Sequence, residues 1–289
     1  MNNSLADETK KTLKKHGLHP KKRLGQNFLI DEKIMDGIIE AAELGPDDLA
    51  VEIGPGLGGL TLRLAQRVGS LLAIEIDEQL VAVLRQTLIH YPNVKLIRDD
   101  ILKLDLDQAV REAFPDAKFP YKIVANLPYY ITTPIIMNLL ERRKQIRSMV
   151  LMVQKEVGER MKALPGTKDY GSLSIAVQYY ADTELVLRVP PCSFRPVPEV
   201  DSVVIKLNLR TTPKVKPTDE QLFFQVVRGA FAQRRKTLVN SLSNTFTEIQ
   251  KDQLISILRY LGIDLNIRGE QLSLEQFCAI ADAIATNRR

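Results

Sequence analysis

The residues best equipped for chemistry lie in the stretch VANLPYYITTP, residues 124–134. An apolar run ends there, and an amide, a proline and an aromatic ring follow at Asn126, Pro128 and Tyr129. The side-chain oxygen of Asn126 and the backbone carbonyl of Leu127 are two acceptors for the hydrogens of an exocyclic amine. Pro128 fixes the backbone and donates no hydrogen bond, while Tyr129 offers a face for base stacking. The pattern is suited to positioning the amino group of an adenine.

The amino group of adenine is a poor nucleophile, because its lone pair is delocalised into the ring. Two acceptors aimed at its hydrogens favour the pyramidal nitrogen that can attack a methyl group. If the methyl donor is already activated, no strong base is required, and catalysis consists mainly of positioning and electrostatics. The alternative for residues 126–130 is a simple turn after a strand, with both tyrosines in the core.

A glycine-rich loop, EIGPGLGGLT at residues 52–61, predicts a nucleotide-like cofactor. Gly54, Gly56 and Gly59 match the spacing G-x-G-x-x-G between an expected strand and an expected helix, where glycine allows a tight turn and close approach of a ligand. Glu75 follows Gly54 by 21 residues, at the end of the next expected strand. A carboxylate there can accept hydrogen bonds from both ribose hydroxyls.

The loop alone does not decide between a dinucleotide and S-adenosylmethionine (SAM). Glu52, just before the first glycine, would repel a pyrophosphate, but it is compatible with the cationic end of SAM or with loop amides. Asp99 and Asp100 end the third expected strand, where an acid can accept a hydrogen bond from the adenine amino group. These acids favour SAM. An NAD-dependent oxidoreductase remains an alternative, although no obvious proton-relay residue lies near the loop.

Alternating strands and helices must position these residues. Short apolar runs predict strands, and segments with helical spacing of apolar residues predict helices between them. The expected strands are residues 49–53, 71–76, 94–98, 121–125 and 148–154, and the expected helices are residues 31–44, 60–68, 78–89, 105–114 and 133–143. Such alternation predicts an α/β fold with a parallel sheet covered on both faces. Asn126 then emerges at the carboxyl edge, where ligands bind.

The pattern changes after residue 155. Helices are expected at 155–163 and 173–181, strands at 183–189 and 202–209, and an extended proline-rich loop at 190–201. Beyond the linker 211–217 only helical segments remain, at 223–233, 236–244, 251–261 and 272–284. We therefore expect a basic N-terminal tail over residues 1–20, a cofactor-binding domain over 21–210 and a small all-helical domain over 211–289.

Composition and charge restrict the function classes. No apolar run reaches the roughly 18–20 residues of a membrane span, and no signal peptide is recognisable at the N-terminus, so we expect a cytoplasmic protein. Two cysteines and three histidines predict neither a disulfide framework nor a metal site. The net charge is +5 over residues 1–25, −5 over 26–187 and +5 over 188–289. Positive ends around an acidic centre suit a polyanionic partner, although a soluble protein with a solvated basic tail has the same pattern.

Three further motifs carry a resemblance to a known family: GQNFL (25–29), FRPVPEVDS (194–202) and FAQRRKTLVNSL (231–242). Together with EIGPGLGGLT and NLPYY, and in this order, they resemble the small-subunit (16S) ribosomal RNA adenine N6,N6-dimethyltransferases of the KsgA/RsmA type. The resemblance runs from about Lys21 to the C-terminus, and residues 1–20 lie outside it. It implies a Rossmann-like SAM-dependent methyltransferase sheet with a small all-helical C-terminal domain. The implied activity is dimethylation of two adjacent adenosines in a hairpin loop near the 3′ end of small-subunit rRNA, in an assembling subunit.

The resemblance also implies roles for individual residues. The implied cofactor-binding residues are Asn27, Leu29, Gly54, Gly56, Glu75, Asp100 and Asn126, and the implied catalytic residues are Asn126, Leu127, Tyr129 and Phe194. Tyr129 and Phe194 would sandwich the extruded base, although Phe194 could instead fill the edge of the core. Tyr130 stands where many relatives have a short polar residue, which could alter the rim of the pocket.

Basic residues outside the cofactor motifs are candidates for RNA contacts. They are Lys22, Arg23, Arg142, Arg143, Arg234, Arg235 and Lys236. Solvated helix faces and helix-dipole complementation are the alternative interpretations. We expect a monomer that binds small-subunit rRNA without metal or membrane. Two rival functions stay open: a large-subunit rRNA adenine dimethyltransferase of the antibiotic-resistance type, and a small-subunit assembly factor in which methylation is secondary.

Overall fold

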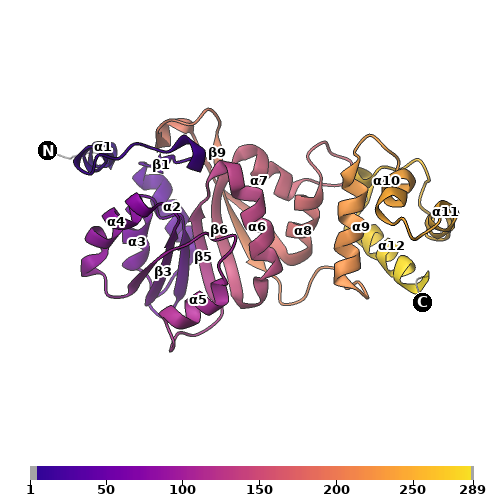
Figure 1. Cartoon of the computed structure of the whole chain (residues 1–289), viewed down its shortest axis with the longest axis horizontal. Helices are drawn as coiled ribbons and strands as arrows, with labels where there is room; N and C mark the ends of the chain where they lie inside the picture. The colour runs from indigo at the N-terminus through magenta and orange to yellow at the C-terminus, as the bar shows by residue number, and fades with distance from the viewer. Residues whose placement is uncertain (1–4, 288–289) are drawn as a thin grey trace. The chain divides into compact units, whose positions relative to one another are not determined.

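The computed structural model describes residues 5–287. These residues divide into two units, one formed by the chain up to Gly158 together with Asp182–Leu209, and the other by Glu159–Ala181 together with the chain from Arg210 onward. The strands are β1 (Phe28–Leu29), β2 (Leu49–Ile53), β3 (Ser70–Glu75), β4 (Val94–Arg98), β5 (Tyr121–Asn126), β6 (Ile146–Gln154), β7 (Ala181–Val189), β8 (Phe194–Arg195) and β9 (Ser202–Leu209). The helices of the first part are α1 (Leu5–Lys15), α2 (Glu32–Ala42), α3 (Gly59–Ala65), α4 (Glu78–Thr87), α5 (Leu106–Ala113), α6 (Thr132–Glu141) and α7 (Lys155–Lys162). The later helices are α8 (Ser172–Tyr180), α9 (Glu220–Ala232), α10 (Leu238–Thr245), α11 (Lys251–Tyr260) and α12 (Leu274–Asn287), as Figure 1 shows.

Seven strands form the main sheet, in the order β4-β3-β2-β5-β6-β9-β7. The pairs β2–β3, β3–β4, β2–β5 and β5–β6 are parallel, and β9 runs antiparallel to β6. From β2 the chain builds outward to β3 and β4, then crosses to the other side of β2 for β5 and β6. This reversal creates a switch point between β2 and β5, where open α/β sheets bind their ligands. The α/β fold expected from the alternation is confirmed, with each expected strand present in its place.

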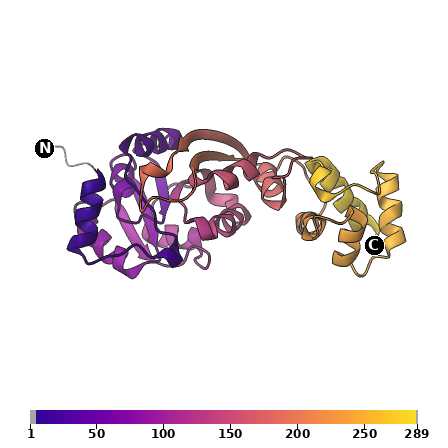
Figure 2. The same cartoon turned by 90° about the horizontal axis from the view of Figure 1, so that it is seen from above.

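Helices cover both faces of this sheet (Figures 1 and 2). The strands are continuous apolar runs because both of their faces are buried; all five residues of β2 are buried. On one face, Met35 and Ile38 of α2 and Leu64 of α3 pack against Val124 and Val150 of the sheet. Helix α2 begins where Asp31 accepts hydrogen bonds from the N–H groups of Lys33 and Ile34, as expected of an N-cap.

The second unit is helical and larger than the sequence indicated. It contains α9 to α12, as expected, but Glu159–Ala181 belongs to it as well. The rings of Tyr179 and Phe223 stack with centroids 4.9 Å apart, and the hydroxyl of Tyr180 donates to Glu220 over 2.8 Å. The chain passes between the two units three times, after residues 158, 181 and 209, and the expected boundary at residue 210 describes only the last of these passages. Helix α8 packs with the C-terminal helices because its aromatic residues complete their core.

Two short elements differ from the expectations. Residues 5–15 form the helix α1, in the segment where the sequence indicated only a basic N-terminal tail. The proline-rich loop contains β8, which pairs antiparallel with β1, so that Phe28 faces Arg195 and Leu29 faces Phe194. Two motifs about 165 residues apart in sequence thus lie side by side. Across residues 5–287, none of the helices has the length and apolar character needed to span a bilayer.

Candidate active site

The glycine loop lies at the switch point of the sheet. Gly54 and Gly56 have φ angles of 70° and 62°, a region that side chains other than glycine rarely adopt. A Cβ atom on Gly56 would lie 3.3 Å from the ring of Phe28. The loop therefore needs glycine for two reasons: its backbone conformation, and the close approach of the β1 segment.

Glu75 ends β3 beside this loop and is 6% exposed. Its carboxylate accepts hydrogen bonds from the N–H of Gly56 (3.2 Å) and of Asp77 (2.9 Å). Burial raises the pKa of Glu75, and the two N–H groups offset part of that effect. Two backbone donors thus fix the carboxylate at the cavity, and its remaining lone pairs can accept hydrogen bonds from a ligand.

Glu52 is a second buried carboxyl in the same cavity, at 2% exposure. Its Oε2 atom, like the hydroxyl oxygen of Thr61, has no hydrogen-bond partner within residues 5–287. Burial raises the pKa of Glu52 to about 8; the Thr61 hydroxyl nearby lowers it in part, and the Glu75 carboxylate raises it further. A buried acceptor without a partner costs stability, so Glu52 is poised to pair with a donor or a cation brought by a ligand.

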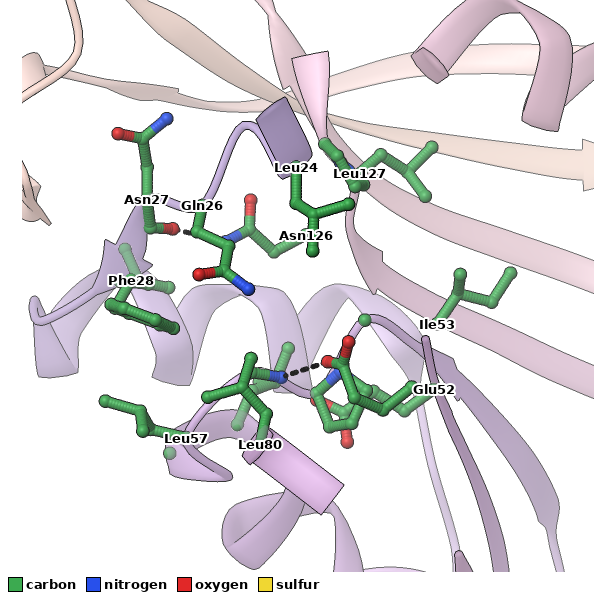
Figure 3. Close-up of a pocket in the computed structure, with 18 of the residues that line it drawn as sticks. Leu24, Gln26, Asn27, Phe28, Glu52, Ile53, Leu57, Leu80, Asn126 and Leu127 are labelled. Carbon is green, nitrogen blue, oxygen red and sulfur yellow. Dashed lines mark hydrogen bonds between the residues drawn. The ribbon is translucent and has the colours of Figure 1, made fainter. Parts of the chain in front are cut away.

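Asn126 and Leu127 leave β5 at the carboxyl edge, as expected. The side-chain Nδ2 of Asn126 donates to the backbone carbonyl of Asn27 over 3.3 Å, a contact drawn in Figure 3. The N–H of Leu127 donates to the carbonyl of Met152 over 3.1 Å. Since the Asn126 amide uses its nitrogen to hold Asn27, its oxygen remains available as an acceptor.

Tyr129 lines the cavity, and Phe194 does not. The hydroxyl groups of Tyr129 and Ser202 are 2.6 Å apart and hydrogen-bonded, which holds the ring at the wall. Phe194 is fully buried in the core cluster of α2 and β6, because its strand β8 is pinned to β1. The expectation that Phe194 offers an open face to a base is not met in this structure; its loop would have to move first.

Asp100 and Tyr130 form the rim. Asp100 lines the cavity and its Oδ1 accepts the N–H of Leu102 over 3.0 Å, a turn-capping contact. Tyr130 is 51% exposed, and a Cβ on Gly25 would lie 3.1 Å from its ring. Tyr130, the bulky residue expected at the rim of the pocket, therefore packs against Gly25 of the GQNFL motif.

The cavity encloses about 280 Å³ and brings together most of the expected site residues. Those lining it are Asn27, Leu29, Gly54, Gly56, Glu75, Asp100, Asn126, Leu127 and Tyr129. They come from the segments after β2, β3, β4 and β5 and from the β1 region, because the parallel strands all end at one edge.

Three residues that sequence analysis missed tie the GQNFL segment over this edge. Asp77 accepts hydrogen bonds from Lys21 Nζ (2.7 Å) and from Gln26 Nε2 (2.8 Å). Burial alone would raise the pKa of Asp77, but these hydrogen bonds hold it below its usual value. Asp77 also caps α4 by accepting the N–H of Gln79. The aspartate before an expected helix signals that cap; its two distant partners had no sequence signal.

Some of the candidate RNA-binding side chains are exposed, and others form hydrogen bonds within the protein. Arg235 and Lys236 are exposed. Arg234, by contrast, donates to the carbonyls of Lys168 (2.6 Å) and Tyr170 (3.3 Å), so part of its role is structural. Arg142 and Arg143 donate to the carbonyls of Leu104 and Leu140 near the end of α6. Arg23 is exposed, and the side chain of Lys22 lies outside the described part of the structure.

Comparisons with known proteins agree with this site. The sequence model of the ribosomal RNA adenine dimethylase family matches residues 17–286. The ribosomal RNA small subunit methyltransferase A of Alkaliphilus oremlandii is 48% identical over 278 residues, 96% of this chain and 96% of that protein. The protein of the same name from Bacillus cytotoxicus is 49% identical over 284 residues, 98% of this chain and 97% of that protein.

Two solved structures share the fold at 27% sequence identity. A dimethyladenosine transferase from Plasmodium falciparum aligns with a TM-score of 0.73, covering 90% of this chain and 98% of that one. The 23S rRNA methyltransferase ErmE aligns with a TM-score of 0.65, covering 90% of this chain and 100% of that one. With the family model spanning nearly all of its length, the chain belongs to the ribosomal RNA adenine dimethylase family.

Proposed function

We propose that this enzyme transfers methyl groups from SAM to the N6 amines of two adjacent adenosines in a hairpin loop near the 3′ end of small-subunit rRNA, within an assembling subunit. The observation that carries the proposal is the state of Asn126. Its side-chain nitrogen donates a hydrogen bond to the Asn27 carbonyl. Its side-chain oxygen takes no part in that hydrogen bond and remains available as an acceptor. One amide thus links the cofactor-side motif GQNFL to an acceptor for the target amine.

The cavity suits SAM by its shape and its donor set. The glycine loop leaves room for the amino-acid end of the cofactor, and Glu75 is fixed as an acceptor for its ribose hydroxyls. The unpaired Oε2 of Glu52 suits a cationic group better than a pyrophosphate. Asp100 would accept a hydrogen bond from the adenine amine, and Asn27 and Leu29 would line the other wall. When bound, SAM supplies an activated methyl group.

The chain's own residues then position the target. The oxygen of Asn126 and the carbonyl of Leu127 accept the two hydrogens of the adenine amine, which favours a pyramidal nitrogen. Tyr129, held by Ser202, stacks on the base. Phe194 would complete a sandwich only after its loop moves from the core. Preorganised acceptors at a site closed from water are the main source of rate enhancement in such a design.

Several features favour the small-subunit substrate over the large-subunit one. The curated relatives at 48–49% identity are named small subunit methyltransferases, whereas the ErmE structure is 27% identical. The NLPYY and QRRKTL segments point the same way. We further propose that the protein acts as a cytoplasmic monomer without metal. The residues proposed to contact rRNA phosphates are Lys22, Arg23, Arg142, Arg143, Arg235, Lys236 and, in part, Arg234.

The test offers radiolabelled SAM with undermethylated small subunits, mature small subunits, large subunits and naked rRNA. Mass spectrometry of each digested rRNA then locates dimethyladenosine. We expect label in undermethylated small subunits only. Dimethyladenosine in the large-subunit rRNA would overturn the proposal in favour of the resistance-type activity. An Asn126→Ala variant that restores subunit assembly without methylation would favour the assembly-factor reading.

A further inference from the structure

Helix α1, residues 5–15, has two faces of opposite character. Leu5, Thr9, Thr12 and Leu13 recur at the spacing of one helical face, and all are buried or half-buried. The four lysines of the helix, Lys10, Lys11, Lys14 and Lys15, are exposed on the remainder of its surface. The family model begins at residue 17 and does not include this helix, although the alignment with the Bacillus cytotoxicus protein covers 98% of this chain.

The inner face of α1 is part of the cofactor cavity. Leu5, Glu8, Thr9 and Thr12 line the same cavity as Glu75 and the glycine loop. Leu5 packs against the core cluster of Leu29 and Met35, and Leu13 packs against the cluster of Phe28 and Leu80. The helix therefore closes one side of the space in which the cofactor is proposed to lie.

The C-terminal end of the helix is tied to the body of the unit by hydrogen bonds and an ion pair. The N–H of Leu18 bonds to the Leu13 carbonyl over 2.8 Å at the turn that ends α1, and Lys21 is then locked to Asp77. Toward its start, Leu5 is the apolar anchor. An isolated helix of this length is marginal in water, so the population of docked α1 depends on its tertiary contacts, among them those of Leu5 and Leu13. A modest extra interaction on the outer face can shift that population.

The outer face carries four lysines and one exposed acid, Asp7, so its net charge is positive and suits a polyanion. None of its four lysines forms an ion pair with any residue between 5 and 287. Two of them, Lys10 and Lys14, are one turn apart, as are Lys11 and Lys15, which gives two columns of charge along the helix. The partner of this enzyme class that carries closely spaced negative charge is the phosphate backbone of rRNA.

We propose that α1 couples RNA binding to cofactor retention: its lysine face binds phosphates of the rRNA substrate, and its apolar face is thereby held over the cofactor cavity. This rests on the proposed function only in taking rRNA as the substrate. Coupling between two binding sites is reciprocal. RNA should therefore slow release of the cofactor or its demethylated product, and the occupied cavity should tighten RNA binding.

The experiment compares two pairs of substitutions that remove the same charge. Lys10→Gln with Lys14→Gln changes one column of α1. Lys95→Gln with Lys118→Gln is the control, because both residues are exposed on the same unit away from the cavity lining. S-Adenosylhomocysteine is the cofactor probe, and undermethylated small subunits are the RNA probe. The measurements are the dissociation rate of the probe with and without subunits, and subunit binding across a salt series.

For the α1 pair we expect unchanged probe affinity without RNA and loss of the slowing that RNA causes. The salt dependence of subunit binding should flatten by roughly 0.7–0.9 in log–log slope per lost phosphate contact. The control pair should behave as wild type. Parallel salt lines and an unchanged effect of RNA on the α1 pair would overturn the proposal, as would a wild-type protein in which RNA does not slow probe release.

A second variant tests the inner face. Leu5→Ala with Leu13→Ala should speed release of the S-adenosylhomocysteine probe several-fold in the absence of RNA. Unchanged release from this variant, with a normal thermal melt, would contradict closure by α1. Wild-type methylation of the same subunits is measured alongside. If it is absent, the proposed function fails; if it is present and the α1 variants match wild type, only the coupling fails.

Discussion

The polar side chains of the cavity and the basic side chains of the C-terminal unit differ in how they are held. Glu75 accepts two backbone N–H groups, and Asn126 is oriented by a backbone carbonyl. Arg235 and Lys236 are exposed, and no hydrogen bond or ion pair restrains their side chains within residues 5–287. Groups that position a reacting atom are fixed before the substrate arrives, whereas groups that attract phosphates can order on contact. Substitutions in the cavity should therefore affect the rate or cofactor affinity, whereas substitutions on the basic surface should affect RNA binding and its salt dependence.

The largest effect is expected from Asn126→Ala. Removing one preorganised polar group from a transition-state site typically lowers the rate about a hundred- to thousandfold, while the fold should survive. Asn138→Ala, which removes an asparagine of α6 outside the cavity lining, is the matched control. Single-turnover methylation of undermethylated subunits is the measurement. A near-normal rate of methylation by Asn126→Ala would show that Asn126 does not take part in methyl transfer.

Glu75→Ala should weaken binding of SAM rather than transfer itself. Hydrogen bonds to a charged acceptor contribute roughly 1.5–3 kcal/mol each, so loss of the ribose contacts should lower affinity at least about tenfold. Calorimetric titration with SAM measures this. Glu78→Ala, an exposed acid three residues away that pairs with Arg98, is the control and should bind normally. Equal affinities in the two variants would refute the ribose assignment.

The basic surface should show a smaller effect that depends on salt. Because Arg234 also holds the carbonyls of Lys168 and Tyr170, the cleaner test is Arg235→Gln with Lys236→Gln. We expect several-fold weaker subunit binding at physiological salt, a flatter salt dependence and unchanged SAM affinity. Lys251→Gln with Arg259→Gln, on α11, is the control of equal charge. If both pairs lose the same affinity, the effect is one of net charge rather than contact.

The smallest effect concerns stability and pH. Burial raises the pKa of Glu52 to about 8, above its unfolded value of about 4.3, so the folded state holds the proton more tightly. The stability from this group is present in full below that unfolded pKa and is lost as pH rises toward 8. Ligand-free wild type should therefore lose melting temperature, by a few degrees, between pH 5 and pH 8 relative to Glu52→Gln. Parallel melting curves for the two proteins would contradict the assignment.

The amino-acid sequence by itself determined the order and type of the elements and the identity of the chemical groups. Continuous apolar runs at β2, β3 and β5 could only be buried strands, and the residues after them had to meet at one edge because the strands are parallel. For that reason Gly54, Glu75 and Asn126 could be placed together without a structure. A local feature such as the cap of α2 at Asp31 has its physical cause within a few residues, because the carboxylate accepts the N–H groups of Lys33 and Ile34.

Only the tertiary structure decided the contacts made across long stretches of chain. The pairing of Phe28 with Arg195 buried Phe194, Asp77 joined Lys21 and Gln26, and residues 159–181 packed with the C-terminal helices. The same holds for α1. Its lysine-rich sequence indicated a solvated tail, but in the structure Leu5 and Leu13 pack against the core clusters of the first unit. In each case the stabilising free energy comes from contacts between residues that are distant in sequence. The order of the residues alone does not specify which distant residues come into contact.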